Sequence, residues 1–295
     1  MLWRRRWRPS RTRHGLSLAK LHVHVGLGLT MILNCRTVFI SDIHLGTRGC
    51  QADQLLDFIK ILECQQLYLI GDIVDGWKLR SGWKWPQSHS DVVQKLLRLA
   101  RKGVAITYIP GNHDDRLRDF CGVHFGGVVV ARDAIHDTAD GRRFLVTHGD
   151  EFDGIVTHAK WLALLGDYGY RALLSINTKW NGLRRRMGLG YWSLSAYVKL
   201  KVKNAVAFID QFERCVAEEA RRRGVDGVIC GHIHHAEMRE IDGILYINDG
   251  DWVESCTALI EHHDGRLELI DWARYCQAAA ATERAPVLDA AAAWQ

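Results

Sequence analysis

The sequence lacks any long apolar run, since no window approaches the roughly 18 consecutive apolar residues of a membrane-spanning helix. This absence predicts a chain that does not cross a membrane and at most lies on a membrane surface. Apolar residues make up 47% and charged residues 25%, which is normal for a globular protein. At 295 residues the chain can bury a substantial core in one large domain or two small ones.

The sequence also lacks any C-x-x-C pair. Its eight cysteines are scattered, at Cys35, Cys50, Cys64, Cys121, Cys215, Cys230, Cys256 and Cys276. Several of them lie in apolar runs that are typical of strands, so we interpret them as reduced core thiols and not as a disulfide framework. This usage favours a cytoplasmic protein, with a peripheral position at the inner face of the cell membrane as a further prediction.

Acidic residues are absent from the first 30 positions, which carry Lys20 and six arginines. Without these seven charges, 32 basic residues stand against 34 acidic ones, so the net charge of +5 comes mainly from this tail. We interpret residues 1–30 as a disordered tail or as a start assigned too early, with Met31 just before the first clear strand; an Arg-rich transit peptide is the alternative. Residues 276–295 are predicted to form an Ala-rich tail.

A β-α-β-α-β order is predicted for the first part of the chain. The alternating strand and helix patterns lie at 36–42, 52–63, 67–72, 90–103 and 104–112. The second helix is expected to begin at Ser90 as N-cap and to stop at Gly103. This order implies parallel strands joined by right-handed crossovers.

The pattern then changes. Strands are predicted at 128–131 and 143–150, joined by a turn at Asp140-Gly141. A helical segment at about 155–224 precedes four closely spaced strands, at 226–232, 243–250, 256–263 and 266–272. We predict the α/β fold class, with a two-sheet αββα sandwich over residues 31–275 that is interrupted by the helical segment as an inserted cap.

Polar side chains follow five of the predicted strands, at the carboxyl edge where ligands gather in α/β sheets. The sets are Asp42 and His44, then Asp72 and Asp75, then Asn112, His113 and Asp114, then His148 and Asp150, and finally His232, His234 and His235. Each set alone is weak, because a single Asp-x-His pair is common. Burying five such sets of polar side chains at one edge would cost free energy unless a cation paired with them.

The ligand types are carboxylate, imidazole and amide oxygen, without thiolate. They favour Mn²⁺, with Fe²⁺ or Zn²⁺ as alternatives. More ligands are present than one ion needs, so two divalent ions are predicted, a pair that can activate water against a phosphoryl group.

The series D-x-H, G-D-x-x-D, G-N-H-D, H-G-D and G-H-x-H resembles the calcineurin-like metallophosphoesterase superfamily across about residues 37–262. Within it, the layout is similar to the UDP-2,3-diacylglucosamine pyrophosphohydrolases of lipid A biosynthesis, which also carry a helical cap between the fourth and fifth blocks. The resemblance implies a hydrolase of phosphorus–oxygen bonds that acts on a phosphate-containing small molecule or a nucleotide-lipid.

The resemblance also implies a role for each matching residue. One metal ion would be held by Asp42, His44 and His234, the other by Asn112, His148 and His232, with Asp72 bridging both. His113 would contact the phosphate or protonate the leaving group, and Asp75 would orient His113. His235 would point elsewhere, and its role stays open.

The predicted cap concentrates positive charge. Between residues 155 and 204 there are nine basic residues, one acidic residue and several interleaved aromatics. One interpretation is a solvated helical face. The other is a lid that binds substrate or a membrane surface through Arg184, Arg185, Arg186 and Trp192.

One departure bears on the substrate. The third block of the lipid A enzymes typically reads G-N-R-D, whereas this chain has His113, the more general superfamily form. A nuclease or general phosphodiesterase of the same superfamily is therefore an alternative, although nucleic acid is disfavoured because the chain without its tail is slightly acidic. A non-catalytic module that kept the fold predicts eroded ligands, and none of the seven is eroded.

Overall fold

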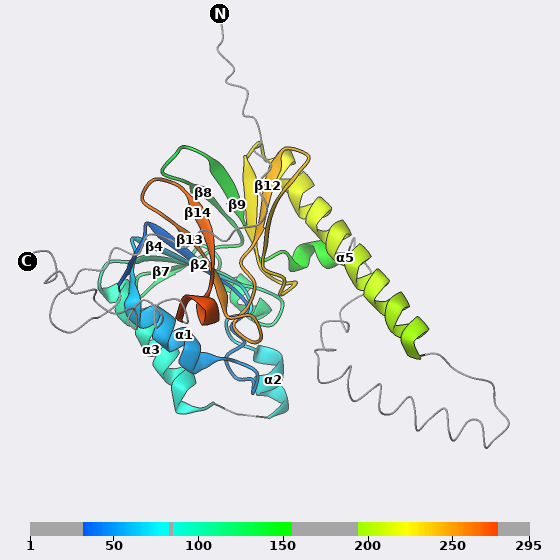
Figure 1. Cartoon of the computed structure of the whole chain (residues 1–295). Coiled ribbons are helices and arrows are strands. Elements are labelled where there is room, and N and C mark those ends of the chain that lie inside the picture. Colours follow the sequence, from blue (N-terminus) through cyan, green and yellow to red (C-terminus); the bar gives the residue numbers. More distant parts are fainter. Residues whose placement is uncertain (1–31, 83–84, 155–193, 277–295) are drawn as a thin grey trace, which may run out of the picture.

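Two β-sheets lie face to face at the centre of the protein, with helices on their outer faces (Figure 1). The computed structural model describes residues 32–82, 85–154 and 194–276. The two-sheet α/β sandwich predicted from the sequence is confirmed.

The larger sheet has seven strands. Their order is β14 (Leu267–Asp271), β13 (Thr257–Glu261), β2 (Thr37–Ile40), β4 (Gln66–Ile70), β5 (Ala105–Ile109), β7 (Val128–Val130) and β6 (His124–Phe125). Strands β2, β4, β5 and β7 are parallel, as the β-α-β-α-β order predicts. Their carboxyl ends therefore meet at one edge of the sheet.

The smaller sheet has five strands. Their order is β11 (Glu237–Ile241), β12 (Ile244–Asn248), β10 (Gly227–Cys230), β9 (Arg143–Val146) and β8 (Ala134–Asp137). The central strands β9, β10 and β12 are parallel, and both edge strands are antiparallel to their neighbours. A separate two-stranded pair joins β1 (Leu33–Asn34) to β3 (Leu62–Glu63).

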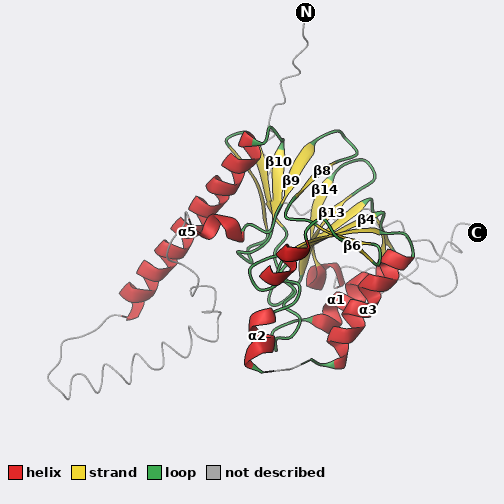
Figure 2. Cartoon of the chain, turned by 180° about the vertical axis from the view of Figure 1, so that it is seen from behind, coloured by secondary structure: helices red, strands yellow, loops and turns green. Residues whose placement is uncertain are grey.

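The helices form two outer layers, which Figure 2 shows from behind. The helical segments include α1 (Ala52–Ile61), α2 (Gly76–Ser81), α3 (Gln87–Arg101), η1 (Asp115–Phe120), η2 (Asp150–Gly154) and α5 (Leu194–Arg222), and a short helix over residues 272–276 follows β14. Helices α1 and α3 cover the larger sheet, and α5 packs on β10 and β12 of the smaller one. The layers therefore run helix, sheet, sheet, helix.

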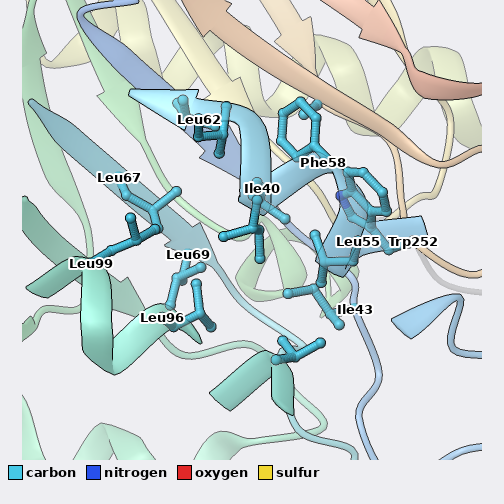
Figure 3. Close-up of a cluster of buried hydrophobic side chains, with 14 of the residues drawn as sticks. Ile40, Ile43, Leu55, Phe58, Leu62, Leu67, Leu69, Leu96, Leu99 and Trp252 are labelled. Atoms are coloured by element: carbon cyan, nitrogen blue, oxygen red, sulfur yellow. The ribbon is translucent and has the colours of Figure 1, made fainter. Parts of the chain in front are cut away.

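Apolar spacing along the helices determines which face each one buries. In α1 the buried Leu55 and Phe58 lie three residues apart on one face. They pack with Ile40 of β2 and with Leu96 and Leu99 of α3 in the core beneath the larger sheet (Figure 3). A second core fills the space between the sheets, and a third joins the smaller sheet to α5.

Two local predictions were wrong. Helix α3 begins at Gln87, after Pro86, and not at Ser90, whose hydroxyl accepts a hydrogen bond from Trp85 Nε1 at 3.0 Å. The turn at residues 138–142 joins β9 to β8 and not to β7, which lies in the other sheet. Strand β8 escaped detection because its inward residue is a histidine, His136, and not an apolar residue.

The predicted cap is described only in part. Residues 155–193 lie outside the described residues, and residues 194–222 form α5. The carboxyl half of α5 buries Phe212, Val216 and Ala220 against the smaller sheet, so this half belongs to the outer layer of the sandwich. Among the described helices, none is long and apolar enough to cross a membrane. All eight cysteines are described, and all are free.

Candidate metal centre

The five sets of polar residues come together where parallel strands end. Asp42 and His44 follow β2, and Asp72 follows β4. His148 and His232 follow β9 and β10, the neighbouring parallel strands of the facing sheet. Because both sheets present their carboxyl ends to the same region, side chains far apart in the sequence become neighbours.

One cluster contains Asp42, His44 and His234, whose potential ligand atoms lie within 4.8 Å of one another. Nε2 of His234 is 3.1 Å from Oδ1 of Asp42 and 3.3 Å from Nε2 of His44. These are the three residues that the resemblance assigns to one ion.

A second cluster contains Asp72, His148 and His232, again within 4.8 Å. Oδ1 of Asp72 is 3.5 Å from Nε2 of His148, and its Oδ2 is 3.8 Å from Nε2 of His44. The two oxygens of this carboxylate thus face different clusters. Asp72 occupies the position that a bridging ligand requires.

Asn112 follows Gly111, whose backbone packs against Asp72 and His148 of the second cluster. A Cβ on Gly111 would be 2.4 Å from Oδ1 of Asp72 and 2.6 Å from Nε2 of His148, so only glycine fits there. The backbone N–H of His113 donates to Oδ1 of Asp72 at 2.8 Å. Asn112 is held between these two contacts.

The backbone at the ligand positions is strained. Five residues have positive φ between 49° and 72°, namely Asp42, His44, Asp72, His232 and His234. The left-handed conformation costs a non-glycine residue about 1–2 kcal/mol, and such strain gathers at functional sites. Here backbone hydrogen bonds maintain it, including His44 N to Asp72 O at 2.8 Å and Asp42 N to Gly71 O at 3.0 Å.

Among the seven candidate ligands, three buried polar atoms have no hydrogen bond of good geometry within the described residues. They are Oδ1 of Asp42, Oδ1 of Asn112 and Nε2 of His148. A buried acceptor without a partner is costly, and a divalent cation is the partner that carboxylate, amide and imidazole share. The residues present therefore fit a pair of divalent ions.

The pKa values of the ligand histidines also fit a cation site. Burial lowers the pKa of His148, but the Asp72 carboxylate outweighs it and raises the pKa to about 10. Burial likewise lowers the pKa of His234, and Asp42 raises it to about 9. Protons thus balance the buried carboxylates in the metal-free protein, and metal binding would displace them.

His113 forms a further group with His44 and Asp72, whose potential ligand atoms also lie within 4.8 Å of one another, and Asp75 lies beside this group. Oδ2 of Asp75 is 3.0 Å from Nδ1 of His113 and 3.4 Å from Nδ1 of His44. Burial lowers the pKa of His113, but the carboxylates of Asp75 and Asp72 raise it above its ordinary value. The Trp77 ring lies 4.1 Å from the His113 ring, centroid to centroid, and is 47% exposed. His113 is therefore held from two sides, and its own side chain is 22% exposed, so it is still reachable from solvent.

Sequence reasoning found Asp114 and Asp150 at strand ends but assigned them no role. Oδ1 of Asp114 accepts from Gly111 N at 2.6 Å, and its Oδ2 accepts from Ile73 N at 2.9 Å, so it ties two ligand loops together. Asp150 pairs with Arg118 at 2.6 Å. Sequence reasoning missed one more residue, Asp153, because it lies far along the chain from His232. In the structure the two side chains are 2.8 Å apart.

Five predicted site residues remain, and the structure describes only one of them, His235. Arg184, Arg185, Arg186 and Trp192 are outside the described residues, so their predicted contact with substrate or membrane stays a prediction. His235 is exposed beside Glu237, with 3.9 Å between Nε2 and a carboxylate oxygen. His235 belongs to none of the three groups of potential ligands among the described residues.

A family model described as calcineurin-like phosphoesterase matches residues 35–236. The chain belongs to the calcineurin-like phosphoesterase family. It is a metal-dependent phosphoesterase, and the family implies divalent ions at the two clusters described above.

Curated relatives of this calcineurin-like phosphoesterase cover most of the chain. A protein of Neisseria meningitidis serogroup B named UDP-2,3-diacylglucosamine hydrolase is 28% identical, with 72% of this chain and 88% of the relative covered. One of the same name from Aeromonas salmonicida is 27% identical, covering 76% and 89%. A solved phosphoesterase from E. coli matches with a TM-score of 0.38 and 15% identity, covering 80% of this chain and 98% of that one.

Proposed function

We propose that this protein is a two-metal pyrophosphohydrolase that cleaves the phosphoanhydride of a nucleotide-linked acylated sugar of the UDP-2,3-diacylglucosamine class. The observation that carries the two-metal part is the Asp72 carboxylate, whose oxygens face His148 and His44 in different clusters. The substrate class rests on relatives of that name that match over most of their length.

The seven ligands would be divided between the two ions, with one residue common to both. Asp42, His44 and His234 would hold one, Asn112, His148 and His232 the other, and Asp72 both. When bound, a pair of divalent ions polarises phosphoryl oxygens and lowers the pKa of water. We propose Mn²⁺ as the metal because the donors are oxygen and imidazole.

The chain's own residues would handle the leaving group. Hydrolysis adds water across the anhydride, so one phosphorus–oxygen bond breaks and the departing oxygen needs a proton or a positive partner. Protonated His113 can supply either through Nε2, since Asp75 occupies its Nδ1 side. The raised pKa of His113 favours the imidazolium form that this role requires.

A second candidate function follows from His113 itself. The lipid A enzymes typically have arginine at this position, and a histidine suits a simple phosphodiester as well. A general phosphodiesterase is therefore the alternative. A nuclease is disfavoured because the chain without its tail is slightly acidic, with 32 basic against 34 acidic residues.

A substrate panel separates these candidates. Protein stripped with EDTA and reloaded with Mn²⁺ would be assayed on UDP-2,3-diacylglucosamine, unacylated UDP-N-acetylglucosamine, bis(p-nitrophenyl) phosphate and single-stranded DNA. We expect kcat/KM to be highest for the acylated nucleotide sugar, and activity to vanish on chelation. A preference for the simple diester would replace the first candidate by the second, and full activity after exhaustive chelation would refute both.

A further inference from the structure

A carboxylate outside the seven ligands contacts one of them. Asp153 belongs to η2, and its Oδ1 lies 2.8 Å from Nε2 of His232. Both side chains are largely buried, at 14% and 10% exposure. The hydrogen bond therefore lies in a region shielded from solvent, where its electrostatic attraction is stronger than on the surface.

This contact determines which nitrogen of His232 remains available. An ionised carboxylate only accepts hydrogen bonds, so Nε2 of His232 carries the proton and donates it to Asp153. The lone pair is then on Nδ1, which becomes the only ring atom that can bind a cation.

The other ligand histidines are oriented in the opposite sense. Nδ1 of His148 donates to the Ile70 carbonyl at 3.0 Å, which leaves Nε2 directed toward Asp72. His44 and His234 likewise approach each other through Nε2, at 3.3 Å. Nε2 of His148 and of His234 faces a ligand carboxylate, Asp72 and Asp42 respectively, whereas Nε2 of His232 faces Asp153, which is not one of the seven ligands.

The rest of the His232 ring has little freedom. Its backbone N–H donates to Oδ2 of Asp42 at 2.9 Å, and its φ is 72°. The ring packs against the rings of His148 and Phe212, with centroids 5.0 and 5.9 Å away. These contacts fix the ring position, while the hydrogen bond at Nε2 selects the tautomer.

Asp153 is anchored well enough for this task. Its neighbour Phe152 is buried in the core with Phe212 of α5. Glu151, one residue earlier, accepts a hydrogen bond from Thr147 Oγ1 at 3.0 Å. The short helix η2 is thus fixed to α5 on one side and to the end of β9 on the other.

We propose that Asp153 is a positioning residue for the second metal ion, which holds His232 as the Nε2–H tautomer and turns Nδ1 toward Asp72 and His148. The inference rests on the two-ion part of the proposed function. Carboxylates that orient a ligand histidine commonly contribute about 10- to 100-fold to metal affinity.

The first test is Mn²⁺ binding to metal-free protein, measured by isothermal titration calorimetry and by metal analysis after gel filtration. We expect the wild type to bind two ions. Asp153→Ala should weaken one of them about 10- to 100-fold and leave the other unchanged. Asp153→Asn keeps an acceptor oxygen for Nε2–H, so it should lose less. Glu151→Gln is the matched control, because it removes a charge from the same helix and keeps the Thr147 contact.

A double-mutant cycle shows whether Asp153 acts through His232. In a His232→Ala background, Asp153→Ala should cause no further loss of Mn²⁺ affinity. An equal loss in both backgrounds would mean that Asp153 acts directly or only supports the fold, and would overturn the inference. Thermal unfolding of the metal-free variants checks that each one folds.

The tautomer itself gives a readout without metal. Long-range ¹⁵N–¹H spectra of histidine-labelled, metal-free protein should show Nε2–H for His232, assigned by its loss in His232→Gln. An Nδ1–H form, or two ions bound by Asp153→Ala at wild-type affinity, would refute the positioning role. A wild type that binds one ion would instead refute the two-ion proposal.

Discussion

Nδ1 of His113 lies 3.0 Å from Oδ2 of Asp75, and the two residues come from loops that follow different strands. The other oxygen of Asp75 accepts a hydrogen bond from Lys78 N at 2.8 Å and caps the start of α2. One carboxylate thus begins a helix and faces a candidate catalytic histidine. Its two oxygens separate these tasks, so substitutions can separate them too.

Asp75→Asn should lower kcat about 100-fold with little change in KM, because the neutral amide no longer stabilises the His113 imidazolium. Asparagine caps helices about as well as aspartate, so α2 should be retained. Asp75→Ala loses the cap as well, and should unfold at a lower temperature than Asp75→Asn. Steady-state kinetics with thermal unfolding of both variants tests this. Wild-type kcat in Asp75→Asn would show that the contact has no catalytic role.

Gly111→Ala should lower activity strongly by crowding the site. The added Cβ would be 2.4 Å from Oδ1 of Asp72 and 2.6 Å from Nε2 of His148, well inside contact distance. Displacements of about 1 Å at a reacting centre can cost about 100-fold, so we expect kcat/KM and Mn²⁺ content to fall together. Gly82→Ala is the control, because its Cβ would meet none of the described residues within 4 Å. Equal activity of both variants would contradict the close approach at Gly111.

Glu261 should make the protein sensitive to acid. Burial raises the pKa of this carboxyl, but hydrogen bonds from His136, Ala139 N, Thr37 and Arg36 outweigh it and lower the pKa from its ordinary 4.5 to about 2. Because the folded state has the lower pKa, this stabilisation is present above about pH 4.5 and is lost as the pH falls toward 2.

Glu261→Gln should therefore lower the free energy of unfolding near pH 7 by about 2–3 kcal/mol, and the difference from wild type should shrink below pH 4. Urea unfolding at a series of pH values measures this. Glu240→Gln, at an exposed position on β11, should leave the pH dependence unchanged. A constant difference between wild type and Glu261→Gln at every pH would show that packing, and not ionisation, is responsible.

Much of the fold could be predicted from local patterns. The run Thr37–Ile40 is buried at all four positions, which is typical of a strand covered on both faces, and a polar residue follows where it ends. Parallel strands place such ends together, so the residues after β2 and β4 could be assigned to one site before any coordinates.

The features that the sequence did not predict depend on contacts between residues far apart in the chain. His136 is buried in β8 because Glu261, far along the chain, accepts its hydrogen bond at 2.8 Å. Asp153 resembles any polar residue after a strand until the fold places it beside His232. Ser90 could cap a helix, but Trp85 bonds to its hydroxyl and α3 begins earlier. In each case a tertiary contact overrides the local signal.

Asp114→Asn should loosen the site through its backbone. Asp114 accepts from Gly111 N at 2.6 Å and from Ile73 N at 2.9 Å, and the Tyr108 hydroxyl also donates to it. An amide would direct its NH₂ group at one of these donors and leave a buried polar group unsatisfied, at a cost of about 1–3 kcal/mol. That cost corresponds to a fall in unfolding temperature of about 2–10 °C.

Tyr108→Phe is the matched variant for Asp114→Asn, because it removes one donor and leaves both backbone contacts in place. It should lower the unfolding temperature less and keep Mn²⁺ affinity close to that of the wild type. Asp114→Asn should weaken Mn²⁺ binding as well, because Gly111 and Ile73 adjoin Asn112 and Asp72. Calorimetric unfolding and Mn²⁺ titration of both variants would test this, and unaltered metal affinity in Asp114→Asn would mean that the ligand loops keep their positions without this carboxylate.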